Sequence, residues 1–348
     1  LELQTINGGI QERARNERFK VFFDISNSKN SILAIAQNYE DQVETLLMRM
    51  FKNSGFFGAG GIKELSFRNN TFIIRPLLKF SKKRLIETCD INKLNFFIDP
   101  SNFDSKFERV RIRHSLKYFN KINFDISQIY MMGSAITKIS NEIEKIFFAK
   151  AKDNFTIHPL GWVSIDSDWF FKNPKVILIV IMRKLLMQIG GTINPPNREK
   201  LNNLIDFMFN YKTNFYEMPS KTLAGCKIRF WKDKIIILRL VRSELPFRLI
   251  KNWNKIIFDN RWLVSGNKNI KVQYPSKINA LFLRKKFDKK KELPWEIWTA
   301  IPICSDRSLL KSSILNLDES NLNNHLNRDS EFINYMCYVN KIKIEFLF

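Results

Sequence analysis

The sequence is poor in cysteine, and its cysteines are far apart. Four occur among 348 residues, Cys89, Cys226, Cys304 and Cys337, and none belongs to a Cys-x-x-Cys pair. Zinc and iron–sulfur sites commonly use such pairs, so we expect neither. Scattered cysteines are typical of a reducing compartment, and we expect a cytoplasmic protein.

Long apolar runs are absent as well. The longest aliphatic run covers residues 176–182 and is closed by Lys175 and Arg183, whereas a helix needs roughly 20 apolar residues to cross a bilayer. We therefore expect no membrane-spanning helix. The first residue is Leu1 and no signal peptide follows it, so we predict that the sequence begins inside a domain.

Histidine is rare too. His114, His158 and His325 are isolated from one another, so no Ser–His–Asp or Cys–His arrangement is indicated. Residues 54–61 contain four glycines but lack the Lys-Ser/Thr ending of a P-loop. This glycine cluster would let backbone approach a ligand, yet a tight loop is the favoured interpretation.

Positive charge, by contrast, is in large excess. There are 57 Lys and Arg against 34 Asp and Glu, a net charge of +23, and residues 221–291 alone contain 20 basic and 4 acidic residues. Part of the lysine content is what AT-rich coding would produce, but a local excess of this size is harder to attribute to composition. It favours contact with a nucleic acid over contact with a membrane surface.

Hydrophobic periodicity indicates several domains. It predicts helices over residues 11–22, 40–51 and 81–90 and strands over 31–36 and 71–74, an alternation typical of an α/β domain with a Rossmann-like parallel sheet over residues 1–120. Long helices over 127–152, 174–189 and 198–211 predict a helical middle domain, residues 121–219. A hairpin of residues 226–231 and 234–240 begins a small β-rich C-terminal domain, residues 220–348, in which 284–291 are expected to be an exposed loop.

The helix expected over residues 40–51 has two contrasting faces. Gln37, Asp41 and Glu44 recur at i, i+4 and i+7 on one of them. The opposite face carries an apolar stripe, formed by Val43, Leu46, Leu47 and Met50. Open α/β sheets bind ligands where a strand leads into a helix, and carboxylates there can hold Mg²⁺ or an ammonium group. From the spacing alone, an ordinary solvated face is the favoured interpretation.

Arginines are concentrated in a later helix start. Arg109 and Arg113 lie one turn apart on one face, while Arg111 points elsewhere. The planar guanidinium group suits phosphate because it donates paired hydrogen bonds. A surface with three solvated arginines fits the composition equally well.

Taken in order, these segments resemble blocks of the tRNA(Ile)-lysidine synthetase family of PP-loop ATP pyrophosphatases. The stronger blocks are residues 9–15 with Arg18 and Phe19, residues 41–49, the glycine cluster, residues 75–78, and residues 99–102 with Arg109 and Arg113. Fainter ones are Gly191 with 195–196, residues 222–226 and residues 258–262. The set covers nearly the whole chain in the order of the family.

The resemblance implies an enzyme that uses ATP and Mg²⁺ to join L-lysine to the wobble cytidine of tRNA(Ile) with a CAU anticodon. ATP adenylates the cytidine, and the lysine amine then displaces AMP. The implied catalytic residues are Arg15, Asp41, Glu44 and Arg109, with Asp41 also a candidate Mg²⁺ ligand. Substrate or phosphate contacts are implied for Arg18, Gln37, Asn38, Arg75 and Arg113, and tRNA contacts for Arg284, Lys285 and Lys286.

The sequence departs from the family pattern in two places. The Ser-Gly-Gly-x-Asp-Ser motif that holds pyrophosphate in the family does not occur, so we expect little or no activity from these residues alone. Gln37 and Asn38 stand where the family usually has histidine, and an amide cannot transfer a proton as imidazole does. A basic RNA-binding protein without ligase activity is therefore the alternative. A tRNA 2-thiocytidine synthase is less favoured, because that family relies on cysteines.

Overall fold

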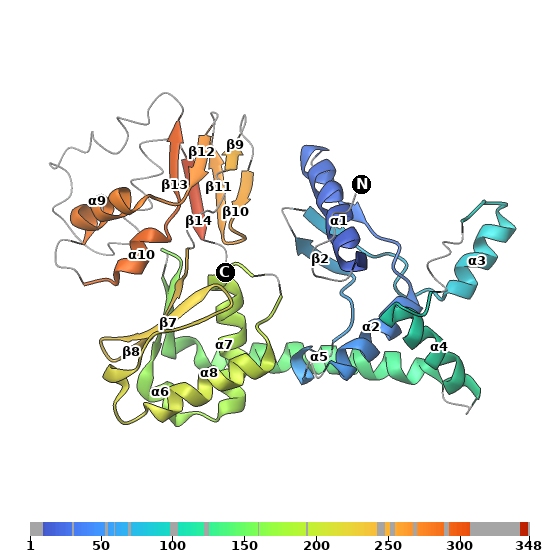
Figure 1. The fold of residues 1–348 in the computed structure, drawn as a ribbon, viewed down its shortest axis with the longest axis horizontal. Helices are drawn as coiled ribbons and strands as arrows, with labels where there is room; N and C mark the ends of the chain where they lie inside the picture. The colour runs from blue at the N-terminus through green and yellow to red at the C-terminus, as the bar shows by residue number, and fades with distance from the viewer. Residues whose placement is uncertain are drawn as a thin grey trace. The chain divides into compact units, whose positions relative to one another are not determined.

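A computed structural model of the chain describes residues 10–29, 31–52, 55–58, 60–68, 71–97, 104–121, 125–158, 160–192, 194–241, 248–250, 255–266, 270–288, 292–306 and 342–346. The chain divides into two compact units, Leu1–Ile143 and Glu144–Phe348, each considered by itself. Helix α5 (Ile126–Ala151) contributes residues to both units (Figure 1). None of the helices in the described ranges is long and apolar enough to cross a membrane.

The first unit contains a small mixed sheet. Strand β1 (Leu33–Ala34) runs parallel to β3 (Thr71–Ile74), and β2 (Leu65–Arg68) lies antiparallel on the other side of β3. Its helices are α1 (Ile10–Lys29), α2 (Tyr39–Phe51), the short η1 (Phe56–Gly58), α3 (Lys82–Ile91) and α4 (Glu108–Lys121). The expected α/β composition is observed. The sequence patterns do not predict β2, however, and its antiparallel pairing means that the described sheet is not wholly parallel.

The core of the first unit lies between α2, α4 and α5. Val43, Leu46 and Leu47 of α2 pack with residues of α4 such as Ile112, which confirms most of the predicted apolar stripe. Met50 was expected in the same stripe, but 48% of its surface is exposed. It lies in the last turn of α2, one turn beyond the packed part of the helix.

The second unit contains a five-stranded antiparallel sheet in the order β4-β5-β8-β7-β6. Its strands are β4 (Phe155–His158), β5 (Trp162–Asp166), β6 (Lys221–Leu223), β7 (Cys226–Trp231) and β8 (Lys234–Arg239). Strands β7 and β8 form the predicted hairpin, and its turn residues Lys232 and Asp233 both have positive φ, as a tight two-residue turn requires. The sheet takes strands from both sides of residue 219, where the sequence predicts a domain boundary.

Helices cover both faces of this sheet. Ile228, Ile235 and Ile237 pack on the layer of α7 and α8, whereas Ile236 and Leu238 pack on the layer of α9 and α10. These helices are α7 (Lys175–Gly190), α8 (Arg198–Asn210), α9 (Lys277–Phe287) and α10 (Trp295–Thr299), preceded by η3 (Lys152–Asn154) and α6 (Ser167–Lys172), with η4 (Phe215–Glu217) between α8 and β6. The alternation of buried side chains along β8 therefore separates two apolar cores.

Two three-stranded sheets complete the second unit. Their orders are β10-β11-β14 and β13-β12-β9, with the bounds β9 (Arg248–Ile250), β10 (Lys255–Phe258), β11 (Trp262–Gly266), β12 (Ile270–Gln273), β13 (Ile303–Asp306) and β14 (Ile342–Phe346). Residues 284–287 belong to α9, so the loop predicted over 284–291 is wrong there. Burial of Ala280 and Leu283 holds that segment on the sheet, and residues 289–291 lie outside the described ranges.

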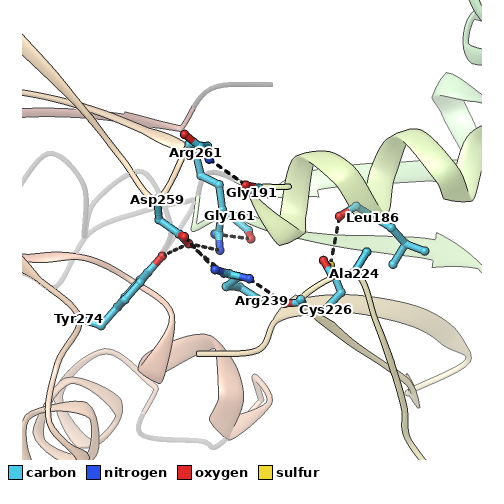
Figure 2. Close-up of polar contacts among 11 residues, drawn as sticks. Gly161, Leu186, Gly191, Ala224, Cys226, Arg239, Asp259, Arg261 and Tyr274 are labelled. Atoms are coloured by element: carbon cyan, nitrogen blue, oxygen red, sulfur yellow. Dashed lines mark hydrogen bonds and ion pairs between the residues drawn. The ribbon is translucent and has the colours of Figure 1, made fainter. Parts of the chain in front are cut away.

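A buried ionic cluster ties the turn between β10 and β11 to the end of β8 (Figure 2). Nε and Nη2 of Arg239 each donate to a different oxygen of the Asp259 carboxylate at 2.8 Å. The hydroxyl of Tyr274 donates to the same carboxylate at 2.5 Å, and Arg261 lies 3.9 Å from it. Arg261 also donates to the carbonyl oxygen of Gly161 at 3.1 Å. One carboxylate thus balances two buried guanidinium groups.

Candidate functional site

The first turn of α2 is fixed by a reciprocal capping interaction. The side-chain oxygen of Asn38 accepts the N–H of Asp41 at 3.0 Å, and the Asp41 carboxylate accepts the N–H of Asn38 at 3.1 Å. This arrangement satisfies two backbone donors that a helix start leaves unpaired. Just before it, the side-chain oxygen of Gln37 accepts from Nε of Arg75 at 2.6 Å. The two predicted amide residues therefore position the helix start and Arg75.

Helix α4 contributes two arginines to the acidic side of α2. Nη1 of Arg109 lies 3.4 Å from Oδ1 of Asp41, and Nη2 lies 3.3 Å from the hydroxyl of Thr45. One turn further along α4, Nε of Arg113 donates to Oε1 of Glu44 at 2.7 Å. Arg109 and Arg113, four apart on α4, thus meet Asp41 and Glu44, three apart on α2, because both spacings place side chains on one face of a helix.

Glu44 is fully buried, which corrects the expectation of a solvated acidic face for this residue. Burial is the largest influence on its carboxyl group and raises its pKa, while the bond from Arg113 acts in the opposite direction. Its second oxygen, Oε2, has no hydrogen-bond partner among the described residues. In this structure Glu44 supports Arg113, and the periodicity of α2 alone could not show that α4 covers it.

Arg15 of α1 lies near Asp41 and Arg109. Partial loss of hydration lowers the pKa of its guanidinium group, and the cations Arg109 and Arg68 lower it further, while Asp41 opposes them. The pKa of Arg75 is likewise lowered, first by burial and then by Arg15. Arginines of β2 and α4 therefore act on Arg15, and Arg15 in turn acts on Arg75.

The structure brings most of the predicted site residues together. Arg15, Asp41, Glu44 and Arg109 interact directly or through short-range charge effects. Arg18 adds to the repulsion felt by Arg15. Guanidinium groups gathered in this way suit the recognition of phosphate, because each can donate paired hydrogen bonds.

The glycine cluster is held by α2 through its carbonyl groups. Arg49 donates to the carbonyl oxygens of Gly60 and Gly61, the latter at 3.0 Å. The amide of Gln42 donates to the carbonyl of Ile62 at 3.1 Å and accepts its N–H. A Cβ atom at Gly61 would lie 2.2 Å from Nε2 of Gln42, so any other residue there would displace the Gln42 side chain from its two hydrogen bonds with Ile62. Sequence reasoning did not single out Gln42, Thr45, Arg49 or Arg68.

Asp41 is the residue for which the sequence motifs imply a metal contact. The described residues contain no group of three or more His, Cys, Asp or Glu that could hold an ion. Asp41 could supply one oxygen, which fits Mg²⁺ that takes its other ligands from substrate phosphates and water. Such an ion would be held with the nucleotide.

The predicted tRNA-binding residues occupy the last turn of α9 in the second unit. Nε of Arg284 lies 3.8 Å from the buried carboxylate of Asp288, and Lys286 lies over the ring of Phe287 at 5.9 Å. Lys285 is exposed. The charge of Arg284 is therefore partly neutralised.

Comparison with protein families gives the class first. Residues 2–118 match the family described as a PP-loop domain. This range contains Arg15, Asp41, Glu44 and Arg109, the residues that the sequence motifs singled out. Residues 2–118 are thus similar to a PP-loop domain. Of the motif residues, 99–102 lie outside the described ranges.

Individual proteins are similar to the chain over a longer part of its length. The chain is 28% identical over 280 residues to the tRNA(Ile)-lysidine synthase of Wolbachia pipientis wMel, covering 78% of this chain and 63% of that protein. It is 27% identical over 92% of its length to the tRNA(Ile)-lysidine synthase of Wolbachia sp. subsp. Brugia malayi (strain TRS), covering 74% of that protein. The synthase of Thermosipho africanus (strain TCF52B) is 33% identical over 64% of this chain and 47% of its own length. The chain is thus similar in sequence to tRNA(Ile)-lysidine synthases over much of its length, which confirms the resemblance. It spans 47% to 74% of the length of these three relatives.

Proposed function

We propose that this protein is an ATP-dependent ligase that joins L-lysine to the wobble cytidine of tRNA(Ile) with a CAU anticodon. The relatives carry the name of this activity. The observation that supports it in the structure is the meeting of Asp41 and Arg109, with Arg15 close enough for its own pKa to respond to both of them. A carboxylate beside a set of arginines suits a reaction that brings an ammonium group to a phosphorylated base.

The two chemical steps have different requirements. In the first, an oxygen of the cytidine forms a bond to the α-phosphorus of ATP and pyrophosphate leaves. Arg15 and Arg109 would stabilise the negative charge on that phosphorus centre. In the second, the lysine amine forms a bond to C2 of the cytidine and AMP leaves. Asp41 would orient the lysine ammonium group before this step, and ATP would bring its Mg²⁺ ion.

The remaining residues would position these groups. Thr45 and Asp41 hold Arg109 from two successive turns of α2, and Glu44 holds Arg113. Fixed guanidinium groups stabilise developing charge better than mobile ones, because no reorganisation is needed when the charge forms. In the second unit, Lys285 and Lys286 would contact tRNA phosphates.

The test is lysine incorporation by protein produced from its complete reading frame. Labelled L-lysine should enter a tRNA(Ile) transcript with a CAU anticodon only when ATP is present, with release of AMP. A transcript with a GAU anticodon is the control substrate. Arg109→Gln should lower kcat/KM by about 100-fold or more, as expected for loss of a charge-stabilising donor. Lys52→Gln is the matched control variant. Lys52 follows α2 and forms an exposed ion pair with Glu108, the residue before Arg109 in α4.

A catalytically inactive tRNA-binding derivative is the second candidate. It is favoured by Gln37 and Asn38, whose side chains are engaged with Arg75 and with the backbone of α2 and cannot shuttle protons. Salt-sensitive tRNA binding without any AMP release would support this candidate and reject the ligase. ATP-dependent AMP formation on the correct tRNA would reject the derivative.

A further inference from the structure

Two arginines lie against two phenylalanine rings on one side of α1. Cζ of Arg15 is 5.5 Å from the ring centroid of Phe19, and Cζ of Arg68 is 5.8 Å from that of Phe23. The two rings lie one helical turn apart, and their centroids are separated by 5.8 Å. Arg15 comes from α1 itself, whereas Arg68 is the last residue of β2, more than forty positions later. The fold thus assembles a pair of guanidinium groups on a shared aromatic support.

The aromatic support is fixed in place. Only 3% of the surface of Phe23 is exposed. The hairpin that carries Arg68 is attached to α1 by the hydroxyl of Thr71, which donates to the side-chain oxygen of Asn27 at 3.2 Å. An arginine that packs its face on a ring keeps the N–H groups of its plane available for other partners. Both arginines are exposed, so these donors can be reached from solvent.

Neither arginine forms an ion pair with any side chain that the structure describes. Arg15 experiences repulsion from Arg68, Arg109 and Arg18, and attraction only from Asp41. Each of these like charges disfavours the others in the absence of an anion. A bound oxyanion with several acceptor oxygens would relieve that repulsion and use the free donors.

We propose that Arg15 and Arg68 together bind a phosphate group, and that Arg68 is a ligand of the substrate site. The proposal rests on the proposed function for the source of the phosphate, which is the polyphosphate of ATP or the backbone of tRNA. Both present the same chemistry, an exposed phosphate oxyanion with two or more acceptors. Phe19 and Phe23 act as the aromatic supports on which the two guanidinium groups lie.

The test compares Arg68→Gln with Arg84→Gln. Arg84 is the matched control, because its guanidinium lies over the ring of Phe80 at 5.0 Å in the same unit and its removal changes the net charge equally. Equilibrium binding of a non-hydrolysable ATP analogue and of the tRNA transcript is measured separately, the latter at several salt concentrations. Arg68→Gln should lower the affinity for one of these ligands by about fivefold or more. Arg84→Gln should leave the affinity for both ligands unchanged. Circular dichroism melts establish that both variants fold.

The two sources of phosphate give different patterns. Loss of affinity for the ATP analogue alone identifies the nucleotide. Loss of tRNA affinity, with a salt-dependence slope reduced by about one, identifies the RNA backbone. Phe23→Leu, which keeps the charge but removes the ring, should cause a smaller loss of the same kind. Equal behaviour of Arg68→Gln and Arg84→Gln toward both ligands would overturn the proposal. Because binding needs no turnover, a wild-type protein that fails to incorporate lysine would reject the ligase and leave this comparison intact.

Discussion

The Asp259 cluster allows a quantitative prediction, because one carboxylate balances two buried arginines. Asp259→Asn keeps the size of the side chain and removes its charge. The side chains of Asp259 and Arg239 are 9% and 12% exposed. Without the carboxylate, the guanidinium groups of Arg239 and Arg261 would stay buried and could not be hydrated instead. Removing one member of a buried pair typically costs about 3–5 kcal/mol. We expect the second unit to lose about 4 kcal/mol of its free energy of unfolding.

Tryptophan fluorescence measures this loss in one unit only. All seven tryptophans lie beyond residue 143, so their signal reports on the second unit. For a urea dependence of about 2–3 kcal/mol per molar, a loss of about 4 kcal/mol lowers the denaturation midpoint by about 1.5 M. The control is Asp206→Asn, which breaks the Lys175–Asp206 pair, whose side chains are 50% and 54% exposed. Exposed pairs contribute at most about 1 kcal/mol.

If Asp259→Asn shifts the urea midpoint no more than Asp206→Asn does, the Asp259 carboxylate does not stabilise the second unit as predicted. A second comparison separates charge imbalance from lost packing. Adding Arg239→Gln to Asp259→Asn removes one of the two unbalanced cations, so the double variant should be more stable than the sum of the two single losses predicts. Simple additivity would show that charge balance does not explain the stability of the cluster.

Three further predictions concern other buried groups. Burial raises the pKa of Glu44 from its ordinary value of 4.5, so the folded state binds this proton more tightly than the unfolded chain does. The free energy of unfolding should therefore fall as the pH rises from 4.5 through the raised pKa. Circular dichroism melts of the wild type should show this fall, and those of Glu44→Gln should lack it. Gly190→Ala would place a Cβ atom 1.9 Å from the carbonyl oxygen of Ala224, so it should lower the urea midpoint, whereas an unchanged midpoint would mean that the backbone can yield there. Burial raises the pKa of Cys226 to about 12, so peptide mapping after alkylation at neutral pH should find Cys89, which is partly exposed, modified well before Cys226.

The parts of the fold that depend on local sequence were predictable. The helix predicted over residues 81–90 begins at a serine, a residue type that favours the N-cap, and the hydroxyl of Ser81 accepts the N–H of Arg84 at 3.3 Å at the start of α3. The hairpin of β7 and β8 followed from two apolar runs around Lys232-Asp233. Strand β2 has only a short, mixed pattern, and the lysines at the end of α9 concealed the two buried positions that hold that helix on the sheet.

The candidate site was predictable in composition but not in contacts. The motifs identified Arg15, Asp41 and Arg109, whose roles in catalysis stay predictions. Contacts between segments distant in sequence decided the rest. The burial of Glu44 depends on α4, sixty-four or more positions later, and the approach of Arg68 to Phe23 depends on how the β2–β3 hairpin docks on α1. Periodicity within one helix contains no information about such partners.

The attachment of the glycine cluster to α2 limits how the sequence can change during evolution. Gln42 exchanges two hydrogen bonds with Ile62, and its amide occupies the space beside Gly61 that any side chain would need. A larger residue at position 61 therefore breaks both of these hydrogen bonds, unless position 42 has become smaller as well. Across diverged orthologues we expect these two positions to change together.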